Sequence, residues 1–286
     1  MTHAVPPPRI SVVVNARDEE RRLPWAIASV RPWANEIVVV DMASRDRTAD
    51  VARDAGAVVV PHPDVGFVEP ARRAGCEAAR GTWILILDAD EMVPAAVGWR
   101  LVEIAGDDTA DAVRMSRRNL LFGAEVVHSG WNLARDRHLR FFRRGAVVLP
   151  DRLHGPIEAR PGARLIELGS ERELALVHFN YVDVEQFLSR LNKYTSIEAR
   201  QETGPTSRWP LMTALRDASR EWFVRYVWHH GYRDGWRGFY LAWFMATYRI
   251  AVHAKRIERA SAGDSDAVER VYRDEANRVL DEYRGQ

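Results

Sequence analysis

This sequence lacks several features that mark particular classes of protein. It has a single cysteine, Cys76, so no disulfide can form within the chain. It contains no run of about 20 apolar residues that could span a bilayer as a helix. Residues 1–9 hold three prolines and no apolar segment of the kind found in signal peptides, so we expect a cytoplasmic protein.

The sequence also lacks a large net charge and the common nucleotide-binding motifs. The formal net charge is +1, so no overall positive field would recruit nucleic acid. No Gly-x-Gly-x-x-Gly follows the first predicted strand, which disfavours a dinucleotide-binding domain, and the absence of Gly-x-x-x-x-Gly-Lys-Ser/Thr argues against P-loop chemistry. What is present is a chain of 286 residues, 47% of them hydrophobic, which is enough to bury a large globular core.

The first hundred residues alternate between buried strands and helices. The predicted strands are 10–14, 37–40, 58–60 and 83–87, and the predicted helices are 19–30, 45–55 and 69–80. This alternation predicts an α/β fold with a mostly parallel sheet, which binds ligands at the carboxyl ends of its strands. Asn15, Asp41 and Asp88 directly follow predicted strands, so we expect them at that edge.

The rest of the chain has a different pattern. Residues 111–169 are irregular with strand-like pieces at 147–149 and 165–168, followed by a strand at 176–178 and a helix at 184–201. Gly204-Pro205-Thr206-Ser207 predicts a boundary, which gives a catalytic domain at 1–205 and a Trp-rich helical region at 206–286. We expect that second region to break at its glycines, 231–238, and to end in a charged helix.

The most informative segment is Ile84–Glu91, Ile-Leu-Ile-Leu-Asp-Ala-Asp-Glu. It predicts a buried strand that ends in a polar cleft, with Asp88 and Asp90 on the same side of the pleat. Two close carboxylates repel each other unless a cation is present, and Mg²⁺ or Mn²⁺ with its oxygen ligands commonly brings substrate phosphates. The alternative is that the pair caps the helix that follows.

Three motifs occur in order along the first hundred residues: Ser-Val-Val-Val-Asn-Ala-Arg-Asp-Glu-Glu at 11–20, Val-Asp-Met-Ala-Ser-Arg-Asp-Arg-Thr at 40–48 and Leu-Asp-Ala-Asp-Glu at 87–91. They resemble those of the inverting family 2 glycosyltransferases, which have a GT-A fold. Three later segments, 176–181, 193–195 and 234–239, are similar to the subgroup around bacterial lipopolysaccharide core glucosyltransferases and glycocin peptide S-glycosyltransferases.

This resemblance implies metal-dependent transfer from a UDP-sugar to a cell-envelope glycan, a lipid-linked acceptor or a peptide. It makes Asp90 the direct ligand of Mn²⁺ or Mg²⁺, while Asp88 contacts the ribose or reaches the metal through water. His178 would complete the metal sphere, although lone histidines are more often structural.

Several residues are expected to hold the nucleotide. Asp41 would accept a hydrogen bond from the uracil imide, or else cap the following helix. Asn15 and Arg17 would line the exit of the first strand, where the backbone touches the base, although Arg17 could instead pair with Glu20.

Arginines are expected to hold the diphosphate, because a guanidinium binds two oxygens at once. Arg72 fits the family pattern, whereas Arg73 replaces its usual Asn; a solvated helix face is the alternative for both. A second basic cluster consists of Arg135, Arg137, His138, Arg140, Arg143 and Arg144. We expect some of these residues to face the diphosphate or an anionic acceptor and the others to be solvated.

The catalytic base is the least defined residue. An inverting transfer needs a carboxylate near the acceptor, on the face opposite the leaving group. Relatives carry a Val-His-Glu-like motif, but this chain reads Leu-His-Gly-Pro-Ile-Glu at 153–158, with Gly155 at the position of the Glu. We therefore expect Glu158 to be the base, with Asp151 as the second candidate.

The segment Gly238–Val252 is apolar nearly all round except for Arg249 and is too short to span a membrane. Burial against a second copy would give a homodimer, which we favour, and shallow burial in a lipid interface is the alternative.

Two other functions stay open. A sugar nucleotidyltransferase shares the α/β layout but has a Gly-rich first loop in place of Asn15–Glu20. A non-catalytic nucleotide-binding scaffold would explain why Gly155 replaces the expected Glu. The sequence names neither the donor sugar nor the acceptor atom.

Overall fold

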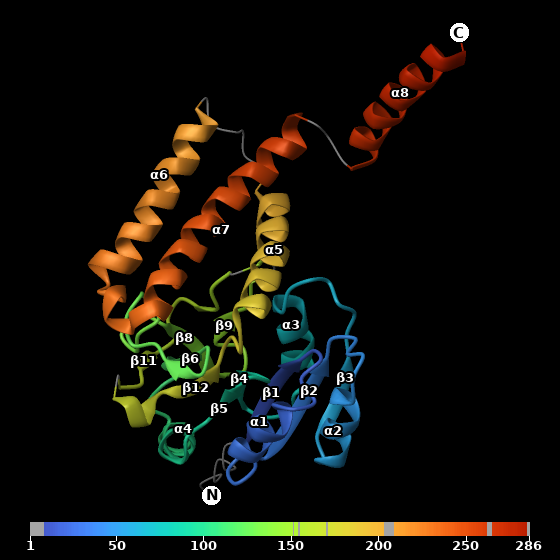
Figure 1. The fold of residues 1–286 in the computed structure, drawn as a ribbon. Coiled ribbons are helices and arrows are strands. Elements are labelled where there is room, and N and C mark those ends of the chain that lie inside the picture. Colours follow the sequence, from blue (N-terminus) through green and yellow to red (C-terminus); the bar gives the residue numbers. More distant parts are fainter. Residues whose placement is uncertain are drawn as a thin grey trace, which may run out of the picture.

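The computed structural model describes residues 9–150, 152–153, 155–169, 171–202, 209–261 and 265–284. Its first half contains β1 (Ile10–Ala16), α1 (Leu23–Val30), β2 (Glu36–Asp41), α2 (Thr48–Asp54), β3 (Val58–Pro61), α3 (Glu69–Ala78), β4 (Trp83–Asp88), β5 (Glu91–Met92) and α4 (Ala95–Asp107). The alternation of strand and helix expected for this half is confirmed (Figure 1).

The later part contains β6 (Ala112–Leu121), β7 (Ala124–Glu125), β8 (Arg137–Arg143), β9 (Val147–Val148), β10 (Glu158–Ala159), β11 (Leu165–Glu167), η1 (Arg172–Leu174), β12 (Leu176–Phe179) and α5 (Val184–Gln201). It ends with α6 (Pro210–Phe223), the π-helical η2 (Val224–Trp228), η3 (Gly231–Asp234), α7 (Gly235–Ser261) and α8 (Ser265–Arg284). The boundary expected at 204–207 lies outside the described residues.

The main sheet has the strand order β3-β2-β1-β4-β8-β6-β12-β5. The first four strands are parallel, β8 runs antiparallel between β4 and β6, and β12 is parallel to β6. The expected α/β class, of GT-A type with a C-terminal helical region, is confirmed. The carboxyl ends of β1, β2 and β4 therefore meet at one edge of the sheet.

Helices cover both faces of this sheet, which is why β1 and β4 are continuous apolar runs. Val12, Val14 and Leu85 pack on one face with α1 and α4, while Val13 and Ile84 pack with α3 on the other.

Gly75 lets α3 approach the sheet closely. A Cβ atom at this position would overlap with the side chains of Val13 and Val40. The absent side chain therefore sets the distance between this helix and the strands that carry the site.

The C-terminal helices are anchored to the sheet through the turn after β6. Phe122, Phe187 and Leu241 belong to a third apolar cluster, which joins this turn to α5 and α7. The Asp234 carboxylate accepts hydrogen bonds from the backbone N–H groups of 127 and 128 and from a Ser hydroxyl at 129, at 2.9–3.2 Å. Helix α8 projects away from the body (Figure 1). No helix among the described residues is long and apolar enough to cross a membrane.

The expectation of an irregular segment at 111–169 is wrong for its two longest strands, β6 and β8. These strands carry arginines within their length, so their polarity hides the strand pattern. Arg117 and Arg140 are largely buried, each in a network of carboxylates rather than in water. Partnered charges thus occupy positions where the period-2 pattern of a strand calls for apolar residues.

Candidate functional site

A cleft of about 1350 Å³ opens at the carboxyl ends of β1 and β4. Strands β6, β8 and β12 form its far wall, and residues of α5 and α7 cover it from above. The residues predicted to bind the nucleotide or the metal that line it are Asn15, Arg17, Arg72, Asp88, Asp90 and His178. The fold therefore brings together side chains separated by more than 160 positions along the chain.

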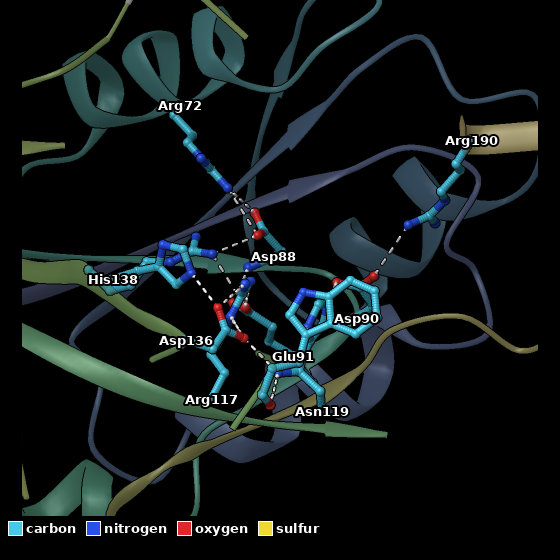
Figure 2. Close-up of polar contacts among 12 residues, drawn as sticks. Arg72, Asp88, Asp90, Glu91, Arg117, Asn119, Asp136, His138 and Arg190 are labelled. Carbon is cyan, nitrogen blue, oxygen red and sulfur yellow. Dashed lines mark hydrogen bonds and ion pairs between the residues drawn. The ribbon is translucent and has the colours of Figure 1, made fainter. Parts of the chain in front are cut away.

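Asp88 ends β4 between two guanidinium groups (Figure 2). Nη2 of Arg72 lies 2.9 and 3.0 Å from its two carboxylate oxygens, and Nη2 of Arg140 lies 2.9 Å from Oδ2. Burial works to raise the pKa of Asp88, but the charges of Arg140 and Arg72 outweigh it and hold the pKa well below its ordinary value. Asp88 is therefore ionised and neutralised by protein groups.

Asp90, two residues further on, faces a histidine. Its Oδ1 atom lies 3.7 Å from Nε2 of His178, and Nη1 of Arg190 approaches Oδ2 at 3.9 Å. Nδ1 of His178 lies 2.7 Å from Oδ1 of Asn119. Because Nδ2 of Asn119 donates to Asp136 Oδ2 at 2.6 Å, its Oδ1 must accept from Nδ1–H of His178.

Because Asn119 engages Nδ1, Nε2 is the His178 nitrogen that faces the Asp90 carboxylate. A carboxylate and an imidazole whose other nitrogen is held by a hydrogen bond are suitable ligands for Mn²⁺ or Mg²⁺. No group of three or more His, Cys, Asp or Glu side chains among the described residues would hold a metal alone. A cation at Asp90 and His178 would therefore need further ligands from a substrate or water.

A buried charge network supports these residues from below (Figure 2). The fully buried Glu91 accepts from the Asp88 N–H at 3.0 Å and from the guanidinium groups of Arg117 and Arg140, each at 3.3 Å. Asp136 binds Arg117 through both its oxygens, at 2.8 and 3.1 Å. The network joins the end of β4 to the middle of β6 and of β8.

His138 extends this network into the cleft. Its Nε2 atom lies 2.7 Å from Oδ1 of Asp136, and 44% of the side chain is exposed. Burial lowers the pKa of His138, and the charges of Arg117 and Arg140 lower it further. The hydrogen bond to Asp136 raises the pKa but does not outweigh these effects. The ring is therefore neutral at neutral pH and can accept a proton.

Two further groups at the end of β1 suit a ligand. Both polar atoms of the Asn15 side-chain amide are buried and have no hydrogen-bond partner in the described part of the chain. Such groups are rare in native proteins unless a ligand or water satisfies them. Nearby, burial and the charge of Asp90 raise the pKa of Glu19 to about 7.

Other predicted residues have different surroundings. Asp41 is not among the residues that line the cleft, and its Oδ1 accepts from the backbone N–H of Ser44 at 3.2 Å. Arg17 lines the cleft but pairs with Asp64 rather than with Glu20.

The arginines divide between the cleft and the rest of the fold. Arg73 donates to the backbone carbonyl of Leu149 at 3.0 Å, outside the cleft. Arg143 pairs with Asp108, and Arg144 donates to the backbone carbonyls at 76, 79 and 81. Of the predicted basic cluster, the remaining members line the cleft: Arg135, Arg137, His138 and Arg140.

The predicted base is not at the cleft. Glu158 is exposed on β10, which pairs with β9, and it is absent from the lining residues. Asp151 and His154 lie outside the described residues. Gly155 does line the cleft, and a Cβ atom there would overlap with Pro150, so the loop has no room for the Glu of the relatives.

Sequence reasoning missed four residues of the site. Asn119, Asp136, Arg117 and Arg190 carry its hydrogen bonds and charges, but they lie in segments without a recognised motif. The available signal was the density of charged residues within otherwise apolar stretches at 112–121 and 136–143.

The sequence is similar to a known protein family and to several individual proteins. The model of the family described as Glycosyl transferase family 2 matches residues 11–155, just over half of the chain. The lipopolysaccharide core biosynthesis glycosyltransferase LpsC of Rhizobium meliloti is 28% identical over 264 residues, which cover 89% of this chain and 94% of that protein.

Shorter matches are more similar. A TPR repeat-containing protein of Synechococcus elongatus is 41% identical over 83 residues, 29% of this chain and 21% of that protein. An undecaprenyl-phosphate 4-deoxy-4-formamido-L-arabinose transferase of Pseudomonas paraeruginosa is 37% identical over 124 residues, 38% of this chain and 37% of that protein.

Among solved structures, glucosyl-3-phosphoglycerate synthase of Mycobacterium tuberculosis, in complex with Mn²⁺ and UDP, is 26% identical with a TM-score of 0.35. The alignment covers 39% of this chain and 44% of that one. The chain thus spans less than half of that synthase and about a fifth of the Synechococcus protein.

Proposed function

This chain belongs to glycosyl transferase family 2, and we propose that it moves a sugar from a UDP-sugar to an acceptor in a metal-dependent, inverting reaction. One observation carries the proposal. Asp90 and His178 face each other at the carboxyl end of β4, and Asn119 holds the histidine nitrogen toward the carboxylate. This arrangement suits a cation that is shared with a diphosphate.

The donor would lie along the carboxyl ends of β1 and β4. The unsatisfied amide of Asn15 supports a polar ligand at β1, and Asp41 would accept from the uracil imide. Arg72 and Arg190 approach from α3 and α5, so they would face the diphosphate oxygens. A divalent cation held by Asp90 and His178 would offset the negative charge of the leaving diphosphate.

Asp88 has a different part in this proposal. Because Arg72 and Arg140 already neutralise its carboxylate, it is less available as a direct metal ligand than Asp90. This favours contact with the ribose, or with the metal through water, and leaves Asp90 as the direct ligand.

The acceptor must lose a proton on the face opposite the leaving group. Glu158 and Asp151 stay predictions for this base. We propose His138 as a further candidate, because it lines the cleft, is oriented by Asp136 at 2.7 Å and is neutral at neutral pH. The Asp136 carboxylate would stabilise the imidazolium that forms when the ring accepts the proton.

The acceptor class is proposed from the relatives. The chain matches nearly the whole length of a protein named for lipopolysaccharide core biosynthesis, and part of one named for undecaprenyl-phosphate. Both names support a cell-envelope glycan or lipid-linked acceptor, with a peptide as the alternative. The homodimer and the cytoplasmic location stay predictions.

Release of the nucleoside diphosphate from a panel of UDP-, GDP- and ADP-sugars, with Mn²⁺ and with EDTA, tests the proposal. We expect release from a UDP-sugar that EDTA abolishes. Binding without any release would favour a scaffold protein, and pyrophosphate release from UTP with a sugar phosphate would indicate a nucleotidyltransferase.

A further inference from the structure

Helix α7 is divided lengthwise between a buried side and an exposed aromatic side. Leu241, Ala242 and Val252 are buried, and Met245 and Tyr248 line the cleft. The other side carries five large residues at helical spacing, with exposed fractions of 39–50%: Trp236, Phe239, Tyr240, Trp243 and Ile250. The segment that is apolar nearly all round in the sequence thus packs one side against the body of the protein and exposes the other.

Helix α6 and the turn that follows it extend this exposed surface. Their exposed apolar residues are Leu211, Met212, Leu215, Phe223, Val227, Trp228 and Tyr232, with exposed fractions of 41–71%. Ring contacts join the two elements: Trp222 lies 5.8 Å from Trp243, and Tyr226 lies 5.8 Å from Phe239 between ring centroids. We call these twelve exposed residues of α6, the turn and α7 the aromatic face.

Basic residues accompany the aromatic face. Residues 209–261 contain nine Lys and Arg against four Asp and Glu, a net charge of +5, whereas the whole chain has +1. The remaining residues therefore carry −4. Arg216, Arg220 and Arg233 are exposed on the same helices and turn as the apolar side chains. Three exposed arginines thus lie on the elements that carry the aromatic face.

We infer that the aromatic face docks on an anionic lipid surface. Tryptophan and tyrosine have an apolar ring and a polar edge, so they are suited to the boundary between headgroups and acyl chains. The neighbouring arginines would attract anionic headgroups. A second copy of the chain, which the sequence favours, is a poorer occupant, because a symmetric contact would bring the exposed arginines of the two copies together.

Docking in this way would hold one wall of the cleft at the membrane. One side of α7 carries Trp243 on the aromatic face, while Met245 and Tyr248 line the cleft from its other side. The inference concerns the surface alone and holds whether or not the proposed chemistry is right.

Flotation of the full chain with vesicles tests the inference. We expect binding to vesicles of equal parts phosphatidylcholine and phosphatidylglycerol, weaker binding to phosphatidylcholine alone, and weakening by salt. The double variant Phe223→Ser/Trp228→Ser should bind these vesicles at least about tenfold more weakly, because it lacks two apolar side chains that would be buried in the lipid. Arg216→Gln/Arg220→Gln should lose about fivefold per arginine.

Matched controls come from the opposite end of the molecule. Trp99→Ser removes a tryptophan that is 52% exposed on α4, and Arg53→Gln removes an exposed arginine of α2. Both should bind vesicles like wild type. All variants should bind UDP equally, which separates a failure of docking from a failure of the proposed function.

Two results would overturn the inference. One is that wild type fails to bind the anionic vesicles, or that Phe223→Ser/Trp228→Ser binds them as well as wild type does. The other is that wild type sediments as a dimer that this double variant dissociates, which would assign the aromatic face to a second copy.

Discussion

The two halves of the sheet, on either side of the β4–β8 pair, are built from different kinds of residue. In β1, β2 and β4 the strand interiors are apolar apart from Ser11, and Asn15 and Asp88 lie near the carboxyl ends of their strands. In β6 and β8 arginines lie within the strands, paired with buried carboxylates.

This difference separates two tasks. The first half presents polar groups to a ligand from an apolar scaffold, so a change there should affect chemistry more than folding. In the second half the charged residues are themselves part of the core, so removal of one partner leaves an uncompensated buried charge. Substituting carboxylates on each side of the sheet tests this contrast.

The largest effect is expected at Asp90 in the first half. Asp90→Asn should lower metal-dependent release of UDP by about 10⁴-fold, because a cation contributes several kcal/mol to the stabilisation of a leaving diphosphate. The variant should unfold at the same urea concentration as wild type. Asp50→Asn, an exposed carboxylate of α2, is the control. Normal turnover by folded Asp90→Asn would remove Asp90 from the metal site.

The base comes next. Either His138→Gln or Glu158→Gln should lower kcat by about 10²–10⁴-fold with little change in UDP affinity. The geometry favours His138. Substitution of the residue that acts as the base should also remove the acidic limb of the pH profile of kcat. If only Glu158→Gln is slow, the Glu158 side chain must reach the cleft during catalysis.

A loss of stability, in contrast, is expected at Asp136 in the second half. Asp136→Asn leaves Arg117 with Glu91 as its single remaining ion-pair partner, so the free energy of unfolding should fall by about 3 kcal/mol. Urea denaturation measures this, with the exposed Asp108→Asn as control. An unchanged midpoint would show that the network is dispensable and that the two halves do not differ as described.

Base selectivity should be smaller. UDP should bind about tenfold more tightly than GDP or ADP, because the uracil imide donates one hydrogen bond to Asp41 that the other two bases would not make. Asp41→Asn keeps an oxygen for the Ser44 N–H but should remove the preference. Calorimetric titrations that give equal affinities for the three diphosphates in wild type would exclude this contact.

The smallest effect concerns pH. Because the pKa of Glu19 is raised to about 7 in the fold, the folded state holds a proton that the unfolded chain loses near pH 4.5. Stability should therefore fall as pH rises from about 4.5 to 7 and remain lower above it. Glu19→Gln should remove this slope in EDTA and gain about 1–2 kcal/mol at pH 8. If the stability of Glu19→Gln falls with pH as steeply as that of wild type, Glu19 is not the group responsible.

The sequence was sufficient for the first half because its signals are local. An apolar run followed by a polar residue specifies both a buried strand and its exposed end, so β4, Asp88 and Asp90 could be placed without coordinates. Parallel pairing then brings Asn15 level with Asp88, as the observed register has it.

The second half could not be predicted in this way. Arg117, Asn119 and Asp136 meet only through the pairing of β6 with β8, and Asn119 reaches His178 across 59 positions. Nothing in the local pattern distinguishes a buried arginine with distant partners from a solvated one. The loop at 153–158 was uncertain for a related reason, since its usual Glu is replaced by Gly155.

The central claim is that Asp90 and His178 bind a cation together with a UDP diphosphate. Calorimetric titration of UDP, with and without Mn²⁺, into wild type and Asp90→Asn tests it most directly. We expect Mn²⁺ to raise the UDP affinity of wild type at least tenfold and to leave that of Asp90→Asn unchanged. Equal UDP affinity of wild type with and without Mn²⁺, or an undiminished Mn²⁺ effect in Asp90→Asn, would contradict the claim.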